Sequence, residues 1–227
     1  MKPSLQILML AFLTAFECSH PTRMAGGGDE VTTGFLYYQN GKAAVNSTVI
    51  AVSSHVVPGL GSPITQFETI TDSLGRYSFG SLPADTYNIY GTNDSLASFQ
   101  AGVEVNNSGR KTIRNDTLKP TGSIIGTVRL SASQDSRTVI IMVIGSTMVT
   151  GPDDSSGYFS LNGLAQGTYP VRFLAVGPQY PVLDTSFSVK SGETTYIGEI
   201  LINSFAALDS IAKTNGMLKA RRPDQNQ

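Results

Sequence analysis

The residues that could carry catalytic or metal chemistry are few in this chain of 227 residues, and they lie far apart. A catalytic zinc ion needs several histidine or carboxylate ligands, but the two histidines are His20, near the N-terminus, and His55, in a segment rich in proline and glycine. A hydrolase pairs its serine or cysteine nucleophile with a histidine, and neither histidine lies in such a pattern. The sequence therefore predicts no enzyme active site, no metal site and no cofactor.

The single cysteine, Cys18, lies just after an apolar run from Ile7 to Phe16. This run has the length of a signal-peptide core and is too short to span a bilayer as a helix. Its position before a cysteine resembles a bacterial lipoprotein signal, which implies a signal peptide over residues 1–17 and makes Cys18 a candidate lipidation site. The alternative is an ordinary secretory signal cleaved after Ala15 or Ala25. Both interpretations predict an exported protein.

Composition limits the partners of the exported chain. Its formal net charge of -1 provides no basic surface for nucleic acid. Three consecutive glycines within residues 18–30 indicate a flexible linker between an anchor and the first folded domain. The chain is 40% hydrophobic, which is ample for a core, and its valine, isoleucine, threonine and tyrosine content favours strands over helices.

An internal repeat organises the remainder of the sequence. The segment from Asp72 to Tyr87 matches the segment from Asp154 to Tyr169 without gaps, at an offset of 82 residues and with seven identities in sixteen positions. Such a repeat indicates one folding unit that is written twice. We therefore expect two small domains, over residues 31–120 and 121–203.

Short apolar segments separated by turn residues predict the strands of each domain. Asn40-Gly41 is a hairpin signal, so the runs on either side of it should pair as antiparallel strands. In the first domain we expect strands at 34–38, 45–52, 67–71, 76–79, 86–90, 99–105 and 112–118. In the second we expect them at 124–130, 138–144, 158–161, 168–175, 180–189 and 194–202.

The C-terminal tail, residues 204–227, differs in character from both domains. Phe205, Leu208 and Ile211 have helical spacing, so a short amphipathic helix could form before the Asn215-Gly216 stop. Its basic residues outnumber its acidic ones by two. We expect a frayed, solvated terminus here rather than a membrane-binding segment.

The two copies resemble the carboxypeptidase regulatory-like domain family. The resemblance rests on a glycine-initiated strand with an Asn-Gly turn, in Gly34 to Val52, and on the aspartate turn, glycine, aromatic, leucine and Thr-Tyr pattern of both repeats. It implies an all-β fold of two tandem transthyretin-like (prealbumin-like) Greek-key β-sandwich domains, which are related to collagen-adhesin B-type and starch-binding-like sandwiches. It implies an accessory module and no reaction.

Carbohydrate binding is the sharper binding hypothesis, because sugar platforms use exposed aromatic faces. Tyr37 and Tyr38 are adjacent in a strand, so one of the two must point outward. Tyr180 lies between Pro178 and Pro181 in a predicted loop. These three tyrosines are the candidate ligand-contacting aromatics.

Calcium binding is a weaker hypothesis. Asp72, Asp153 and Asp154 occupy predicted turns, and aspartates in turns can coordinate calcium, but the spacing of an EF-hand is absent. Hydrogen bonds from an aspartate to nearby backbone amides explain the same positions without a metal.

Together these features predict a non-enzymatic, exported, membrane-anchored surface protein with a structural or protein-interaction role. The alternatives are a glycan-binding accessory protein and, more weakly, a calcium-stiffened adhesin stalk. The expected partners are an unidentified protein or surface polysaccharide, with a membrane reached through Cys18. Specific function should lie in what the two copies do not share, chiefly the loop from Ser53 to Gln66 and the tail.

Overall fold

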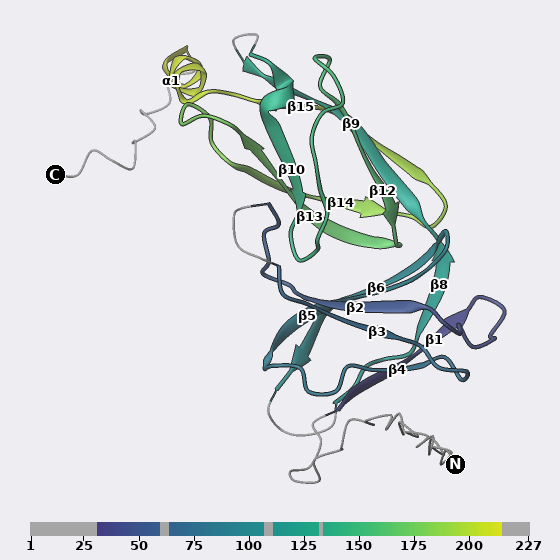
Figure 1. Ribbon diagram of the computed structural model, residues 1–227. Helices are drawn as coiled ribbons and strands as arrows, with labels where there is room; N and C mark the ends of the chain where they lie inside the picture. Colours follow the sequence, from purple (N-terminus) through teal and green to yellow (C-terminus); the bar gives the residue numbers. More distant parts are fainter. Residues whose placement is uncertain (1–30, 60–63, 107–110, 132–133, 215–227) are drawn as a thin grey trace, which may run out of the picture.

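The computed structural model describes residues 31–59, 64–106, 111–131 and 134–214. The predicted signal peptide, Cys18 and the linker over residues 18–30 lie outside the described residues. Within those ranges the chain is all-β with a single α-helix near its C-terminal end (Figure 1). No described helix is long and apolar enough to cross a membrane.

The N-terminal half, residues 31–120, forms one sheet that folds around its own core. The strand order is β3-β2-β5-β6-β8-β1-β4, with β7 also beside β1. The strands are β1 (Thr32–Tyr38), β2 (Thr48–Ser53), β3 (Gln66–Ile70), β4 (Arg76–Ser78), β5 (Asp85–Asn93), β6 (Leu96–Val105), β7 (Lys111–Thr112) and β8 (Asp116–Pro120).

The C-terminal half, residues 121–214, is a sandwich of two sheets with strand orders β11-β10-β13-β14 and β12-β9-β15. It also contains a short 3-10 helix, Ser136–Thr138, and α1 (Phe205–Thr214). The strands are β9 (Gly122–Leu130), β10 (Val139–Val143), β11 (Val149–Thr150), β12 (Tyr158–Leu164), β13 (Gly167–Ala175), β14 (Leu183–Val189) and β15 (Thr194–Ile202).

The two halves repeat one arrangement of strands. In each half the first strand pairs antiparallel with the strand of the repeated segment, β1 with β4 and β9 with β12. The same first strand pairs in parallel with the last one, β1 with β8 and β9 with β15. Each half also has its own cluster of buried hydrophobic side chains. The repeat in the sequence is therefore matched by a repeat in topology.

The Asn40-Gly41 turn joins a hairpin, as predicted, but its second arm is short: Tyr37 of β1 pairs antiparallel with Ala43, whereas the predicted pairing of β1 with the strand over 45–52 was wrong. The turn itself forms, since Gly41 has a φ of +78° and its N–H donates to the carbonyl oxygen of Tyr38. However, β1 lies beside β4, β7 and β8, whereas β2 lies beside β3 and β5. The chain stays beside β1 as far as Ala44, whose N–H donates to the Leu36 carbonyl oxygen. It then leaves β1, because the backbone of Ser47 bonds to the backbone and the hydroxyl of Thr71.

The repeated aspartate turn and glycine have the same structural role in both halves. Asp72 accepts a hydrogen bond from the backbone N–H of Leu74, and Asp154 accepts one from Ser156. The carbonyl oxygens of Gly75 and Gly157 then accept from the first strand of their own half, at 2.8 Å in both cases. Both glycines have positive φ, and a Cβ on either would overlap a backbone oxygen of that strand.

The tyrosine of the repeated Thr-Tyr pair makes the same hydrogen bond in both halves. The hydroxyl of Tyr87 donates to the carbonyl oxygen of Pro83 at 3.0 Å, and that of Tyr169 donates to Ala165 at 2.8 Å. Both rings are buried in the core of their own half. The identities between the repeats are thus explained by turns and core packing, as the sequence indicated.

Candidate functional site: the contact between the two halves

A stack of three aromatic rings joins the two halves. Tyr90 of β5 stacks on Phe99 of β6 with ring centroids 4.9 Å apart. Phe99 stacks in turn on Tyr169 of β13, at 4.8 Å and with an angle of 18° between the planes. Tyr90 and Phe99 lie on the outer face of β5 and β6 and pack against the buried cluster of the C-terminal half. Side chains on the outer face of the N-terminal sheet therefore pack against the core of the C-terminal half.

Hydrogen bonds at Gly145 fix the same contact. The side-chain amide of Asn88 and the hydroxyl of Tyr90 both donate to the Gly145 carbonyl oxygen, at 3.0 and 2.9 Å. The N–H of Gly145 donates to the carbonyl oxygen of Val56 at 2.7 Å. Val56 belongs to the loop from Ser53 to Gln66, which is longer than its counterpart in the second repeat, so part of this loop holds the second half.

Two glycines permit the halves to approach closely. Gly145 has a φ of +73°, and a Cβ there would overlap the side-chain amide of Asn88. A Cβ on Gly167 would lie 2.6 Å from the ring of Phe99. The first repeat has Asp85 at the position of Gly167. The glycine therefore occurs in the copy whose backbone approaches the ring of Phe99.

The strand between the halves is almost continuous. β8 ends at Pro120 and β9 begins at Gly122, so only Thr121 lies between them, and its N–H donates to Ser95 at 3.0 Å. The Pro120 carbonyl oxygen accepts from the Ser191 hydroxyl and from the Gly192 N–H. Such a short, bonded connection leaves little freedom for the two halves to reorient.

In the C-terminal half, the outer face that corresponds to the Tyr90 and Phe99 surface is polar. Tyr90 and Phe99 are directly opposite each other in the first half, and the cross-strand pair at the equivalent place in the second is Arg172 and Asp184. Arg172 donates two hydrogen bonds to Asp184, at 2.7 and 2.6 Å, and these bonds lower the pKa of the aspartate. A charged pair here disfavours stacking of a further aromatic surface.

The candidate aromatics from the sequence occupy different environments. Tyr37 is half-buried on the outer face of β1 beside Phe35, with nearly parallel rings 6.3 Å apart, whereas Tyr38 packs on the core of the N-terminal half. Tyr180 is only 7% exposed and donates its hydroxyl to the Ser131 carbonyl, so this ring packs in the core of the C-terminal half and presents no open face.

A more exposed aromatic surface lies on the outer face of β12-β9-β15, which the sequence reading missed. Tyr196 is 71% exposed and Tyr158 is also exposed. Both residues alternate with buried or half-buried neighbours, and this alternation is the signal that could have placed them outward. On the same face Arg129 and Glu199 form an ion pair at 2.7 Å, and their opposite charges cancel.

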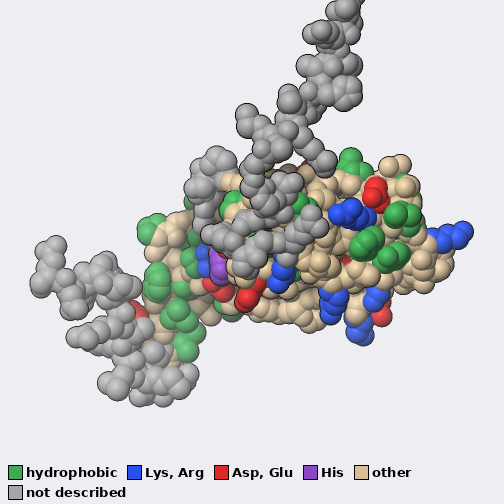
Figure 2. Space-filling view, turned by 90° about the horizontal axis from the view of Figure 1, so that it is seen from below, with side chains coloured by type: hydrophobic (Ala, Val, Ile, Leu, Met, Phe, Trp, Pro, Cys, Tyr) green, Lys and Arg blue, Asp and Glu red, His purple; other side chains and the backbone are tan. Residues whose placement is uncertain are grey.

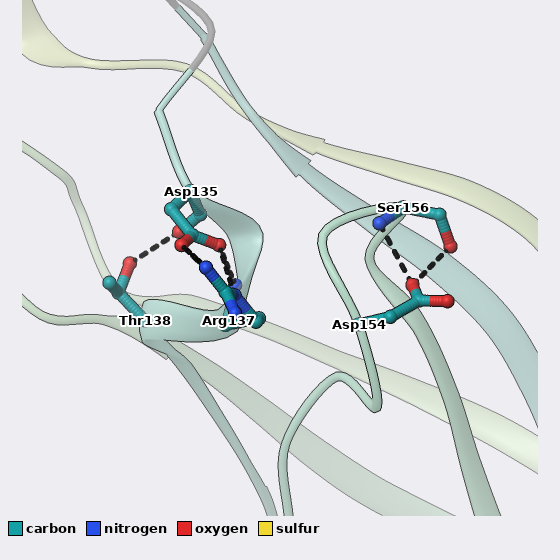
Figure 3. A network of polar contacts seen from close by, with 5 residues as sticks. All are labelled: Asp135, Arg137, Thr138, Asp154 and Ser156. Carbon is teal, nitrogen blue, oxygen red and sulfur yellow. Dashed lines mark hydrogen bonds and ion pairs between the residues drawn. The ribbon is translucent and has the colours of Figure 1, made fainter.

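The acidic turns form no shared cation site. Figure 3 shows Asp135 directed at Arg137 and Asp154 directed at Ser156, each within its own turn. The Arg137 guanidinium lowers the pKa of Asp135, and the Ser156 hydroxyl and N–H lower that of Asp154. Across the residues that the structure describes, no group of three or more histidine, cysteine, aspartate or glutamate side chains is placed to hold a metal ion.

One half-buried carboxyl group, that of Asp116, lies in the N-terminal half. Burial raises the pKa of Asp116, although hydrogen bonds with the Thr117 N–H and with Gln100 and Ser98 oppose this shift. The nearby Tyr77 hydroxyl also has a raised pKa, through burial and through the charge of Asp116. The cluster offers an acid and hydroxyl groups without a histidine base, which is the chemistry of a polar core network.

Comparisons with known proteins give only distant similarity. No protein-family model matches the chain, and no curated protein matches it. A minor pilin of Streptococcus agalactiae aligns at 14% identity over 77% of this chain and 96% of its own, with a TM-score of 0.37. A streptococcal ancillary pilin aligns at 16% identity over 78% and 62%, with a TM-score of 0.36. A candidate carbohydrate-binding protein of Pseudomonas aeruginosa aligns at 19% identity over 39% and 88%, with a TM-score of 0.26.

Proposed function

We propose that this chain is an exported, non-enzymatic spacer protein in which two tandem transthyretin-like Greek-key β-sandwich domains, residues 31–120 and 121–203, act as one stiff body. We further propose that a lipid on Cys18 anchors this body to a membrane. The resemblance to the carboxypeptidase regulatory-like family belongs to the same proposal. A structural role of this kind requires the distance between the two ends of the molecule to be fixed.

The observation that carries the proposal is the contact between the halves. A flexible tandem array would place polar surfaces on either side of a linker. Here Phe99 stacks on Tyr169, and two side chains of the first half donate to one carbonyl oxygen at Gly145. Because the connecting strand is interrupted only at Thr121, the interface and the connection act together.

Small-angle X-ray scattering tests the stiffness. The protein from Ser19 onward, which contains every described residue, should give a distance distribution that a single elongated body reproduces. Replacing Phe99 with alanine should broaden this distribution. A parent protein that already scatters as two independently moving bodies contradicts the proposal.

Membrane anchoring has a separate test. The full-length protein expressed in a bacterium should partition with the membrane fraction, and its intact mass should include a lipid. The Cys18→Ser variant should be released into the soluble exported fraction. An unmodified Cys18 in protein that has lost its first residues would instead support ordinary secretion.

A glycan-binding role is the second candidate, and the exposed surface around Tyr196 and Tyr158 favours it. Sugars bind to exposed aromatic rings flanked by hydroxyl and amide groups, and Ser160, Asn162 and Thr127 lie on the same face of β12 and β9. Tyr37, stacked beside Phe35, is a second platform in this proposal. Titration calorimetry with soluble polysaccharides and the Tyr196→Ala variant tests it, and absence of heat with every polysaccharide rejects it.

A further inference from the structure

The first and last described elements of the chain lie at opposite ends of the molecule. In Figure 1 the strand β1 begins at the lower end, whereas α1, which follows β15, lies at the upper end. The expectation of a frayed terminus was wrong for residues 205–214, because these residues form the regular helix α1. A pull on both of these elements therefore enters the N-terminal half at the start of β1 and leaves the C-terminal half at the end of β15.

The end of β15 is tied to the end of β9. Ser131 directly follows β9, and its hydroxyl accepts a hydrogen bond from the N–H of Ser204, shortly after β15, at 2.8 Å. The N–H of Phe205 donates to the Gln179 carbonyl oxygen at 2.9 Å, and the Ser204 hydroxyl accepts from the N–H of Ala207, as a helix N-cap does. Tension from α1 therefore reaches β15 beside the end of β9.

In each half the two strands on this path lie side by side and run parallel. In the N-terminal half β1 pairs with β7 and β8 near both of its ends, from Thr32 opposite Lys111 to Tyr38 opposite Leu118. In the C-terminal half β9 pairs with β15 at seven register positions on the two sides of a bulge. Because β8 leads into β9 through Thr121 alone, the path crosses only these paired strands.

Tension loads such a pair in shear. The start of the first strand and the end of the last strand lie at opposite ends of a parallel pair, so a pull on both makes the strands slide along each other. The hydrogen bonds of a parallel pair are evenly spaced, and in this direction all of them carry load at the same time. When neighbouring strands are instead pulled apart from one end, their bonds break one after another and a smaller force is enough. Resistance to forced unfolding depends on the unfolding rate.

Side chains add two further links between β9 and β15. The hydroxyl of Ser123 donates to that of Thr194 at 2.9 Å, near the start of both strands. Arg129 and Glu199 form an ion pair at 2.7 Å, nearer the end of both strands. Both links join the strands that take the load, so both must break when these strands slide.

The side surface of the molecule is mixed in character. Figure 2 shows hydrophobic side chains in separate groups, with basic and acidic side chains between them. Scattered hydrophobic side chains are ordinary on the surface of a folded protein and do not mark an interface. The face seen in Figure 2 thus presents no single dominant chemistry, whereas the strand arrangement supports a role between the two ends.

We propose that this protein bears mechanical load, with β1–β8 and β9–β15 acting in series as two strand pairs that resist tension between the ends of the molecule. The inference rests on the proposed spacer role, because tension arises only when one end is anchored and the other is held by a partner. The resistance itself is a property of the folded chain and can be measured without anchor or partner.

Force spectroscopy of the C-terminal half in two pulling directions tests the proposal. The protein from Ser19 onward lacks a cysteine, so cysteines added at chosen positions attach the handles. Handles at Pro120→Cys and at the C-terminus load the start of β9 and the end of β15, so the strands slide. Handles at Gln134→Cys, an exposed position shortly after β9, and at the C-terminus pull the same strands apart from one end. The rupture force should be lower in the second direction, by about two-fold or more, because the bonds then fail in sequence.

The N-terminal half allows the same comparison. One handle stays at Pro120→Cys, at the end of β8, and the other is placed either at the N-terminus or at Gln39→Cys, an exposed position directly after β1. The first arrangement makes β1 and β8 slide, and the second pulls them apart from one end. The rupture force should again be lower in the second arrangement.

The strands β13 and β14 provide a matched control, because they carry the same two kinds of side-chain link. The hydroxyls of Thr168 and Ser188 lie 3.0 Å apart, and Arg172 forms an ion pair with Asp184 at 2.6 Å. Because β13 and β14 can stay paired while β9 and β15 slide, the links between β13 and β14 bear no load in that direction.

Two double variants use this control. Ser123→Ala with Glu199→Gln removes both side-chain links between β9 and β15. At constant force in the sliding direction this variant should unfold about five-fold faster than the parent, from the loss of one hydrogen bond and one exposed ion pair. Ser188→Ala with Asp184→Asn removes the corresponding links between β13 and β14, and it should unfold at the rate of the parent.

Equal rupture forces in the two directions overturn the proposal, as does a β13–β14 variant that unfolds as fast as the β9–β15 variant. X-ray scattering separates this outcome from failure of the spacer role. A protein that resists sliding but scatters as two independently moving bodies keeps its load-bearing halves and loses the stiff spacer. A single stiff body with equal rupture forces in both directions shows the reverse.

Discussion

The ring of Phe99, in the N-terminal half, stacks on the ring of Tyr169, in the C-terminal half, with centroids 4.8 Å apart and an angle of 18° between their planes. Tyr169 is a fully buried core residue, and its hydroxyl donates a hydrogen bond to the turn just before its own strand. Phe99, in contrast, lies on the outer face of its sheet. The pair therefore links the outer face of the N-terminal sheet to the core of the C-terminal half.

Replacing Phe99 with alanine should destabilise the protein by about 2–4 kcal/mol, somewhat less than the roughly 3–5 kcal/mol for a fully buried phenylalanine, because Phe99 is half-buried. Because the stack joins the halves, calorimetry should show the single thermal transition separating into two. The matched control is Phe67→Ala, which removes a ring that packs edge-on against Tyr87 within one half. This control should lower the transition temperature without splitting the transition.

Gly145→Ala should cost about 2–3 kcal/mol, of which about 1 kcal/mol is the strain of a side chain at positive φ. The remainder comes from displacing the Asn88 amide, which the new methyl group would overlap. Gly163 is the control, since it has the same φ of +73° and no atom within 4 Å of its Cβ position. Equal losses for the two variants in urea denaturation would show that the contact at Gly145 contributes nothing.

The pH dependence of stability should report the burial of Asp116. Its raised pKa means that the folded state holds this proton more tightly than the unfolded chain. The stabilisation is then complete below the unfolded pKa, near 4, and is lost as the pH rises through the folded pKa. The Asp116→Asn variant does not lose stability in this way, because asparagine does not titrate. Its Tm minus that of the parent should become more positive between about pH 3.5 and pH 6.

Asp184→Asn is the control of opposite sign. The hydrogen bonds from Arg172 lower the pKa of Asp184, so its stabilisation is present above the unfolded pKa and is lost as the pH falls. The Tm of this variant minus that of the parent should become more negative as the pH rises toward the unfolded pKa, about 4, and should be constant above about pH 5. A difference that is flat with pH for both variants would contradict these assignments.

Removal of calcium should leave the Tm unchanged. Asp72, Asp135 and Asp154 each accept hydrogen bonds from their own turn, so the turns need no ion to hold them. Scanning calorimetry with and without a chelator checks this, after dialysis against calcium. A Tm that falls on chelation would restore the calcium-stiffened stalk as an explanation of the turns.

The repeat allowed much of the fold to be predicted from sequence. Turn residues such as Asp72 and Gly75, and the alternation that buries Tyr87 and Ile89, depend on neighbours within a few positions, and the structure has them as expected. The predicted strand over 112–118 was less accurate, because the structure divides it into β7 and β8. The predicted strand from 45 begins only at Thr48, after the crossing between faces.

Pairing between distant segments could not be predicted in this way. The Asn40-Gly41 turn forms and Ala43 pairs with β1, yet β1 and β2 are not neighbours, because bonds to Thr71 hold Ser47 away from β1. Tyr180 is another example, since proline on either side indicated a loop while the ring packs in the core and bonds Ser131. In both cases the deciding contact lies tens of residues away in the chain.

By itself the sequence determined the all-β character, the repeat and the residues that make its turns, because these depend on backbone conformation and short-range hydrogen bonds. Only the tertiary structure decided which outer surfaces are covered and which stay open. Tyr90 and Phe99 lie beneath the second half while Tyr196 and Leu208 face solvent, although all four are large apolar or aromatic residues in regular elements. Burial of an outer face depends on packing between segments, which local residue patterns do not encode.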